Sequence, residues 1–356
     1  MGEGFRAMAR RVRLLFVLTL VAAGVVYVSY RLAASPEWQQ FEISQFWDSL
    51  THVRLSYVLP GAACIFVSYL FRCLRWQVFL RPLKAAGLGN LYVSTLIGFS
   101  AVALIGRPGE AVRPLLIAHK EGLSAGSQFG AWTLERVFDS LTMGALLGAA
   151  LLFFPPQNVS AGSGAWITHL RTAGILLCVG ALVVAGVLAL LHYFPQSSLR
   201  IFDWFTQPLP QRYRARLRTM AAHFSASLAA ITSLASFLLC SLYSLLVWGT
   251  VLLSFWCVTR AFGWPLNVLE FGAIVLLVVA GITGSVASLP GVGGGTQVAT
   301  ALALTELFGI PLAMATSAAV LLWLLAFMMV LIPGLPLIGR EGLSWQRLRT
   351  LSKGEA

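Results

Sequence analysis

Long apolar runs constrain this chain more than any other feature. A bilayer-spanning α-helix needs about 20 mostly apolar residues, and here 58% of the residues are hydrophobic while only 11% are charged. These runs predict an all-α, polytopic membrane protein and argue against a soluble one. They lie at residues 14–28, 57–71, 91–105, 129–154, 173–191, 237–258, 268–289 and 312–332.

The positive charge of the chain fits the same class. A formal net charge of +12 would indicate nucleic-acid binding in a soluble protein, but in membrane proteins Lys and Arg gather on cytoplasmic loops beside anionic headgroups. The basic segment at residues 200–218 is the strongest such loop, and it is predicted to form a surface helix. We therefore expect a bacterial-type cytoplasmic (inner) membrane protein with both termini cytoplasmic and no nucleic-acid partner.

Charge placement also predicts that two segments do not cross the bilayer. If residues 91–105 crossed fully, the basic segment at 200–218 would lie outside, against the positive-inside rule. The basic segment would lie in the cytoplasm, as the rule requires, if two hairpins entered the membrane from opposite faces and returned. These hairpins are predicted at residues 91–118 and 268–308. The prediction is about six full spans plus two oppositely oriented re-entrant helical hairpins, whose broken backbone must face protein or a wet cavity.

The order of these segments predicts an inverted repeat. Residues 57–154 and 237–333 each consist of a span, a hairpin and a span in opposite orientation, which is a transporter architecture. The remaining parts are an N-terminal span with an outer interfacial helix (1–56), a connecting span at 173–191 followed by the basic amphipathic helix (155–236), and a basic cytoplasmic tail (334–356).

The first predicted hairpin has a charged tip. Ionisable groups at membrane depth cost roughly 2.5–3.5 kcal/mol each, so they are functional candidates by default. A helix N-terminus beside guanidinium groups suits an anion, and the guanidinium fork matches phosphate. The tip consists of Gly106, Arg107, Pro108, Gly109 and Glu110, with Arg113 one turn further on.

Three charged residues open the predicted span that follows. Glu135 and Asp139 share a helix face at spacing four, and Arg136 can pair with Asp139 at spacing three. With Arg107, Glu110 and Arg113 they form the predicted substrate-binding set. Two roles remain open for these side chains. Either they contact an anionic ligand, and a carboxylate carries a coupling proton, or they only neutralise one another in ion pairs.

The second predicted hairpin has a glycine-rich tip. Pro290, Gly291, Gly293 and Gly294 would allow close approach of the backbone, and Thr296 is expected to cap the returning helix. Nucleotide binding is not expected, because no Gly-Lys-Ser/Thr follows. Glu306 is a secondary candidate, as a partner for an arginine.

Three residues at the end of the run at 57–71 have two interpretations. Arg72, Arg75 and Trp76 are expected to anchor the helix at the cytoplasmic interface, and substrate contact by Arg72 and Arg75 is the alternative. Metals and cofactors are not expected, because the five cysteines and five histidines show no ligand spacing.

Four motifs in this order resemble one known family. They are Arg72-Cys73-Leu74-Arg75-Trp76, Gly106-Arg107-Pro108-Gly109-Glu110 with Arg113, Leu134-Glu135-Arg136 with Asp139, and Leu289-Pro290-Gly291 with Gly293. Residues 55 to 335 resemble the transmembrane, flippase-like domain of lysylphosphatidylglycerol synthases, also found as stand-alone membrane proteins. The resemblance implies lipid translocation between leaflets. The family often has an acid after the second glycine motif, where this chain has Gly294-Gly295-Thr296-Gln297.

Together these observations predict a flippase or transporter for an anionic phospholipid or a lipid-phosphate such as a polyprenyl-phosphate. The alternative is the transmembrane part, or the partner, of a lipid-modifying enzyme such as an aminoacyl-phospholipid synthase or a glycosyltransferase, without transport of its own. Enzyme activity in the chain itself is not expected, since only about two dozen residues follow the last predicted span.

Overall fold

α-Helices build the part of the protein that the structure describes. A computed structural model describes residues 42–153, isolated positions between 172 and 186, and residues 233–289 and 291–342. Within these ranges every regular element is helical, which confirms the predicted all-α class. The predicted span at 14–28 and basic helix around 200–218 lie outside the described residues, as does most of the span at 173–191.

Five segments of the described chain are long and apolar enough to cross a membrane, as a polytopic membrane protein requires. α5 is among them, although the charge pattern predicts it as one arm of a hairpin. Helix length alone therefore does not distinguish a helix that crosses the membrane from one arm of a re-entrant hairpin. The five segments are α4 (Leu55–Leu80), α5 (Leu88–Ile105), α7 (Ala125–Phe153), α11 (Leu234–Ala261) and the stretch Leu312–Arg340.

The first helical hairpin consists of α5, a short 3₁₀ helix η1 (Arg107–Ala111) and α6 (Val112–Glu121), which returns alongside α5. Gly106 makes the turn with a φ of 73°, a conformation that favours glycine. At the base, Glu121 accepts a hydrogen bond from Asn90 Nδ2 at 2.9 Å and pairs with Lys84 Nζ at 3.0 Å. These two contacts hold the pKa of Glu121 below its ordinary value.

The second helical hairpin consists of α12 (Phe271–Ser285) and α13 (Gly295–Leu302), which pack against each other. A short helix, η2 (Leu266–Val268), precedes it, and a π-helical segment, η3 (Ala303–Leu307), follows it. The return helix is capped by Gln297, whose Oε1 accepts from Gly294 N at 2.7 Å. The prediction that Thr296 is the cap is therefore wrong. Thr296 is buried, and its own amide donates to Ser288 Oγ at 3.1 Å.

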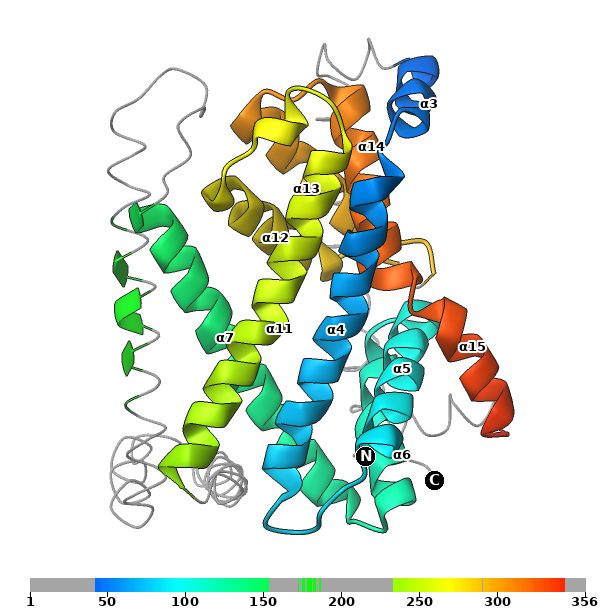
Figure 1. The fold of residues 1–356 in the computed structure, drawn as a ribbon, viewed down its shortest axis with the longest axis vertical. Helices are drawn as coiled ribbons and strands as arrows, with labels where there is room; N and C mark the ends of the chain where they lie inside the picture. Colours follow the sequence, from blue (N-terminus) through cyan, green and yellow to red (C-terminus); the bar gives the residue numbers. More distant parts are fainter. Residues whose placement is uncertain are drawn as a thin grey trace, which may run out of the picture.

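The tips of the two hairpins touch. Gly291 N in the second tip donates a hydrogen bond to Ala103 O, near the end of α5, at 2.8 Å. Figure 1 shows α5 and α6 in the lower half of the molecule and α12 and α13 in the upper half. The two hairpins thus approach each other from opposite ends of the molecule and meet near its mid-height.

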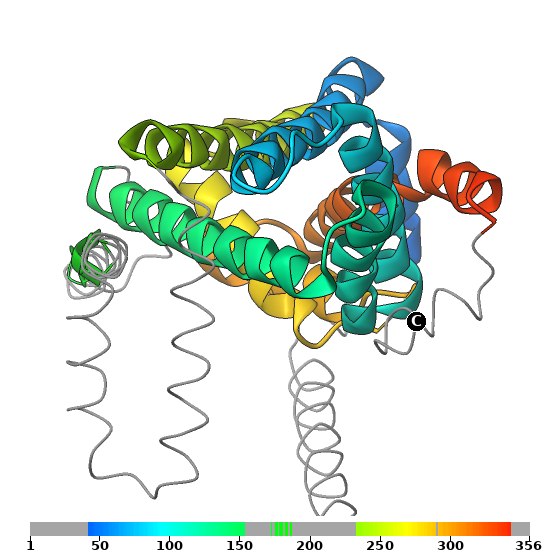
Figure 2. The same cartoon turned by 90° about the horizontal axis from the view of Figure 1, so that it is seen from below.

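The long helices surround this meeting point. α4 and α11 pack along each other, and in the view from below α7 lies on the opposite side (Figure 2). One buried cluster, which includes Val258 and Ile274, joins α11 to the second hairpin. Another, which includes Phe79, Leu91 and Leu134, joins α4, α5 and α7. Each hairpin is therefore fixed to long helices by its own apolar core.

The last predicted span, residues 312–332, is not one straight helix. It divides into α14 (Leu312–Trp323), a π-helical segment η4 (Leu324–Met328) and α15 (Leu331–Arg340), which diverges from the bundle in Figure 1. Pro333 has no amide hydrogen to donate to the carbonyl of Met329, so the helical ladder is interrupted there. The last helical segment of the second predicted half, residues 237–333, is therefore interrupted, whereas α7, its counterpart in the first half, is continuous.

The segment predicted as an outer interfacial helix forms the short helix α3 (Ile43–Thr51). None of its residues is buried, and Ile43 and Trp47 expose 65% and 59% of their surface. Ser317 Oγ on α14 donates to Phe46 O at 2.9 Å, which ties α3 to the bundle.

Candidate functional site

Glu135 on α7 is enclosed by guanidinium groups. Its side chain is fully buried. Arg113 Nη1 on α6 lies 2.9 Å from Oε2, and Arg75 Nη2 on α4 lies 3.0 Å from Oε1. Arg72 Nη1 is 3.5 Å from the same Oε1. One carboxylate of α7 therefore holds α4 and α6 together.

Asp139 lies one turn further along α7 and is enclosed in the same way. Arg75 Nη1 is 2.9 Å from Oδ1, while Arg136 Nη2 and Arg72 Nη1 are 3.0 and 3.3 Å from Oδ2. The Arg136–Asp139 pair at spacing three is the one the sequence predicts. We call Arg72, Arg75, Arg113 and Arg136, with Glu135 and Asp139, the arginine cluster.

The prediction that Arg72, Arg75 and Trp76 anchor α4 at the cytoplasmic interface is wrong. Arg75 and Trp76 are fully buried, and Arg72 exposes 8% of its surface. α4 continues past residue 71 because the carboxylates of α7 and Ser244 Oγ, 2.6 Å from Arg75 Nη1, compensate the two guanidinium groups. Without such partners a buried charge costs several kcal/mol.

Local packing orients Arg113. The Arg113 guanidinium stacks over the Trp76 ring at 4.1 Å from its centroid, a favourable cation–π geometry. Gly98 on α5 makes room for it, because a Cβ at Gly98 would lie 2.5 Å from Arg113 Cβ. Trp76 Nε1 in turn donates to Gln128 Oε1 at 3.1 Å. Arg113 is thus held from two sides while part of its guanidinium stays unbonded.

Two predicted site residues lie outside the ion pairs. Arg107 is exposed and Glu110 is half-buried, and neither is within ion-pair distance of an opposite charge in the described part of the chain. The interpretation that the charged residues of the tip only neutralise one another in ion pairs is therefore wrong for Arg107 and Glu110. Glu306 is exposed and pairs with no arginine in the same ranges, so the structure also contradicts that secondary assignment.

Both hairpin tips border one cavity of about 330 Å³. Its lining includes Gly106, Arg107 and Glu110 from the first tip, and Gly291 and Gly293 from the second. Gly291, Gly293 and Gly294 all have φ between 72° and 93°, which allows this tight loop. Pro290 lies outside the described residues, and Pro108 and Gly109 belong to η1 but are not among the described lining residues.

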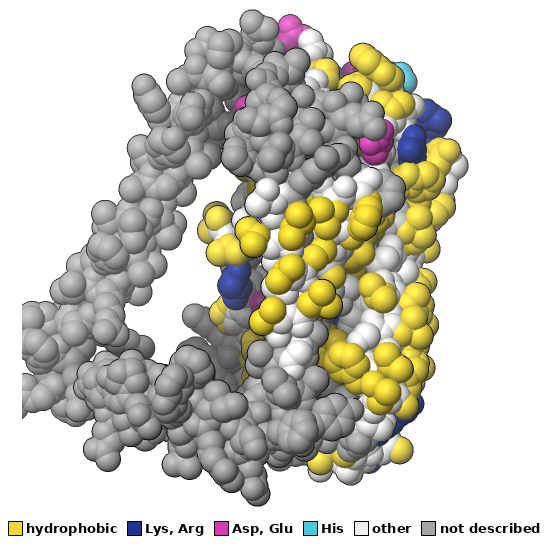
Figure 3. All heavy atoms as spheres, turned by 90° about the vertical axis from the view of Figure 1, so that its left-hand side faces the viewer, with side chains coloured by type: hydrophobic (Ala, Val, Ile, Leu, Met, Phe, Trp, Pro, Cys, Tyr) yellow, Lys and Arg dark blue, Asp and Glu magenta, His cyan; other side chains and the backbone are white. Residues whose placement is uncertain are grey.

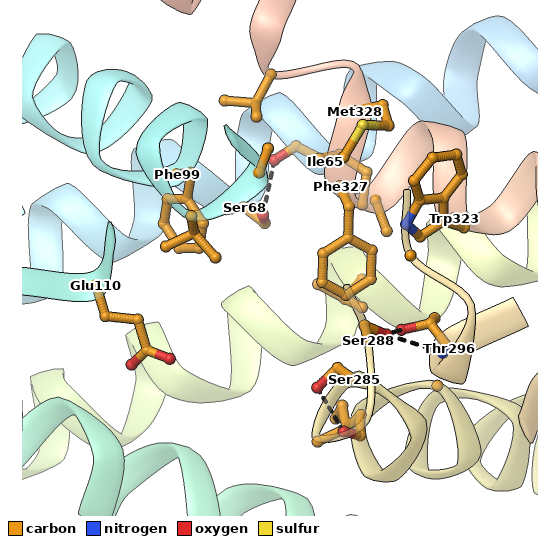
Figure 4. A pocket seen from close by; sticks show the side chains of 18 of the residues that line it. Ile65, Ser68, Phe99, Glu110, Ser285, Ser288, Thr296, Trp323, Phe327 and Met328 are labelled. Atoms are coloured by element: carbon orange, nitrogen blue, oxygen red, sulfur yellow. Dashed lines mark hydrogen bonds between the residues drawn. The ribbon is translucent and has the colours of Figure 1, made fainter. Parts of the chain in front are cut away.

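The described walls of the cavity combine guanidinium groups from α4, η1, α6 and α7 with polar and apolar side chains. Figure 4 shows Glu110 projecting from the first hairpin toward the space that Ser285, Ser288 and Thr296 border from the second. Phe327 lies across the same space. The charged lining residues are Arg72, Arg107, Glu110, Arg113 and Arg136, so guanidinium groups outnumber carboxylates on its surface by four to one.

Several buried guanidinium nitrogens have no hydrogen-bond partner in the described chain. In the arginine cluster they are Nε of Arg72 and of Arg75, and both Nε and Nη2 of Arg113, while Arg260 Nε is another outside the cluster. A buried donor left unbonded costs about 1–3 kcal/mol, and more when it is charged. Arg72 and Arg113 line the cavity, but these nitrogens are themselves closed to it, so an anion would bond them only after the side chains shift.

Fold and site define a class of protein: a polytopic helical membrane protein in which two helical hairpins meet at an arginine-lined cavity. The chain belongs to the family described as the lysylphosphatidylglycerol synthase TM region, whose model matches residues 9–334. This confirms the family resemblance of the four motifs and supports a lipid-related function in a membrane. A comparison with curated proteins gives no match.

Sequence reasoning missed the full role of α4. Arg72 and Arg75 appeared only as secondary candidates, because they follow the apolar run as basic anchors often do. Arg72 and Arg75 lie three residues apart on one helix face, and Glu135 and Asp139 lie four apart on another. These spacings could have indicated ion pairs between the two helices. The aromatic partners Phe99, 5.5 Å from the Arg72 guanidinium, and Trp248, 5.8 Å from it, carried no such signal.

Proposed function

We propose that the protein moves an anionic lipid between the leaflets of the membrane, with the headgroup in the cavity and the acyl chains in the bilayer. The observation that carries this proposal is the cavity wall, on which four guanidinium groups and one carboxylate converge. Arginine forks bind phosphate bidentately. Membership of a lipid-related membrane family supports the same conclusion.

The surface of the protein supports lateral entry of a headgroup. Figure 3 shows the face on the left-hand side of Figure 1, where Lys or Arg side chains lie at mid-height with Asp or Glu beside them and hydrophobic side chains nearby. Charged groups at this depth are rarely left facing hydrocarbon without a function. A lipid approaching this face would bring its headgroup to the basic groups while its tails stay among apolar side chains.

The lengths of the hairpin arms support the re-entrant arrangement, which is part of the proposal. At about 1.5 Å per residue, α6 with 10 residues reaches about 15 Å, and α13 with its continuation η3, 8 + 5 = 13 residues, reaches about 20 Å. A hydrocarbon core is about 30 Å thick. Neither arm can return across it, so each tip would lie near the midplane, where a transported headgroup meets its largest barrier.

Replacing Arg107 with glutamine tests this function. Because Arg107 lines the cavity, is exposed and has no ion pair in the described ranges, the change removes a ligand charge without breaking the arginine cluster. We expect leaflet exchange of fluorescent phosphatidylglycerol in reconstituted vesicles to slow at least about tenfold, the effect of losing about 1.4 kcal/mol of headgroup binding. The measurement is the fraction of label protected from an impermeant quencher over time.

The matched control is Arg81→Gln, which removes the same charge from an exposed residue that does not line the cavity. Exchange in this variant should equal that of the unmodified protein. Normal exchange in folded Arg107→Gln, Arg113→Gln and Arg136→Gln variants would refute the proposal. Absence of exchange in the unmodified protein would instead favour the non-transporting partner of a lipid-modifying enzyme.

A further inference from the structure

We propose that the cavity selects a lipid whose headgroup is a phosphate monoester, with two negative charges, over one whose phosphate is a singly charged diester. This inference rests on the proposed function and names its substrate class. It follows from three features of the site: the charge count, the unbonded donors and the composition of the rest of the wall.

The first feature is the charge count. The arginine cluster together with Arg107 and Glu110 holds five guanidinium groups and three carboxylates, which gives 5 − 3 = +2. Two of the carboxylates, Glu135 and Asp139, already form ion pairs with the four arginines of the cluster. Their negative charges therefore cancel two of the guanidinium charges. A dianion would neutralise the site, whereas a diester monoanion would leave one positive charge uncompensated in a partly buried place, which is unfavourable.

The second feature is the number of free donors. Arg113 exposes only 5% of its surface, yet its buried Nε and Nη2 have no partner in the described chain, and the same holds for the buried Nε of Arg72. Both residues line the cavity, and exposed Arg107 adds a further fork. A phosphate monoester offers three terminal oxygens to these groups and a diester only two, so the monoester satisfies more of them.

The third feature is the rest of the wall, which carries no competing charge. Among the described lining residues, α11, α12 and α14 contribute no charged side chain, and α4 contributes Arg72 together with the uncharged Ile65, Ser68 and Tyr69. The lining residues that the structure describes include no His, Lys, Asp or Cys. Apolar residues such as Phe99, Phe255 and Phe327 complete it, which favours a phosphate that carries acyl or prenyl chains over a free phosphate ester.

The test compares two lipids on the purified protein in a neutral detergent. Phosphatidic acid, a monoester, and phosphatidylglycerol, a diester, are added with identical acyl chains, and native mass spectrometry counts the bound molecules. At about pH 8 we expect phosphatidic acid to be preferred about tenfold, and at about pH 5 the preference should vanish, because the second phosphate ionisation lies near pH 6. The phosphate diester of phosphatidylglycerol keeps one charge at both pH values, so any change in its binding between them reports titration of the protein itself.

Variants test the charge count directly. Arg107→Gln lowers the net charge to +1 and should abolish the preference at about pH 8, while Arg107→Lys keeps the charge and should retain it. Arg81→Gln, outside the cavity, should behave as the unmodified protein. Glycerol 3-phosphate at matched concentration should displace little lipid. Complete displacement would support the monoester site but overturn a lipid as its source.

Equal binding of the two lipids at about pH 8 would overturn the inference. That result would leave the proposed function intact, since transport of an anionic lipid is measured separately by leaflet exchange. Loss of exchange with a retained monoester preference would overturn transport alone. The two failures are therefore distinguishable.

Discussion

Glutamine in place of Glu135 is expected to lower the free energy of unfolding by about 3–5 kcal/mol, which is the range for removing one partner from a buried ion pair. Glu135 is fully buried and lies within 3.6 Å of four guanidinium groups. Its neutralisation raises the net charge of the site from +2 to +3 and removes the contact that joins α4 and α6 to α7.

Thermal loss of the monodisperse peak in size-exclusion chromatography measures this effect. Glu306→Gln is the matched control, because Glu306 is exposed, and it should change stability by no more than about 0.5 kcal/mol. Adding Arg75→Gln to Glu135→Gln returns the charge count to +2 and should recover part of the loss. A Glu135→Gln variant as stable as the unmodified protein would show that the ion pairs do not hold these helices.

Alanine in place of Gly109 is expected to cost about 2–3 kcal/mol, at the upper end of the range for overpacking. A Cβ at this position would overlap the carbonyl group of Ala101 and the amide nitrogen of Val102. Backbone atoms cannot move aside as a flexible side chain does. The η1 turn would therefore shift away from α5, and Arg107 and Glu110 with it.

Gly126→Ala is the matched control for this variant. Gly126 is exposed near the start of α7, with open space where a Cβ would lie. Its replacement should be neutral or stabilising by about 0.5–1 kcal/mol, since alanine favours the helix. Equal thermal midpoints for Gly109→Ala and Gly126→Ala would contradict the close packing of the first tip.

The helical arrangement could be predicted from two local signals. Apolar runs gave the positions of α4, α5, α7 and α11, because the length of a spanning helix is fixed by the bilayer. The Gly and Pro residues around Gly106 gave the first turn. Helix ends were less accurate, since α4 continues through two arginines that are compensated only in the folded protein.

The contacts of the site were harder to predict because they join distant parts of the chain. Arg75 bonds Ser244, 169 positions away, and no local pattern marks such a pair. The hydrogen bond between Gly291 and Ala103 is of the same kind. By contrast, Arg136 and Asp139 lie three apart on one helix, so their ion pair was predictable from spacing alone.

The central claim is that two hairpins enter the membrane from opposite faces and meet at the cavity. Labelling of single cysteines with an impermeant thiol reagent, in a protein whose five native cysteines are replaced, tests it most directly. The sites are Leu83 and Gly126 at the base of the first hairpin, and Trp264 and Glu306 at the base of the second, all exposed. We expect Leu83→Cys and Gly126→Cys to react from one side of the membrane, and Trp264→Cys and Glu306→Cys from the other. Reaction of Leu83→Cys and Gly126→Cys from opposite sides would contradict the claim.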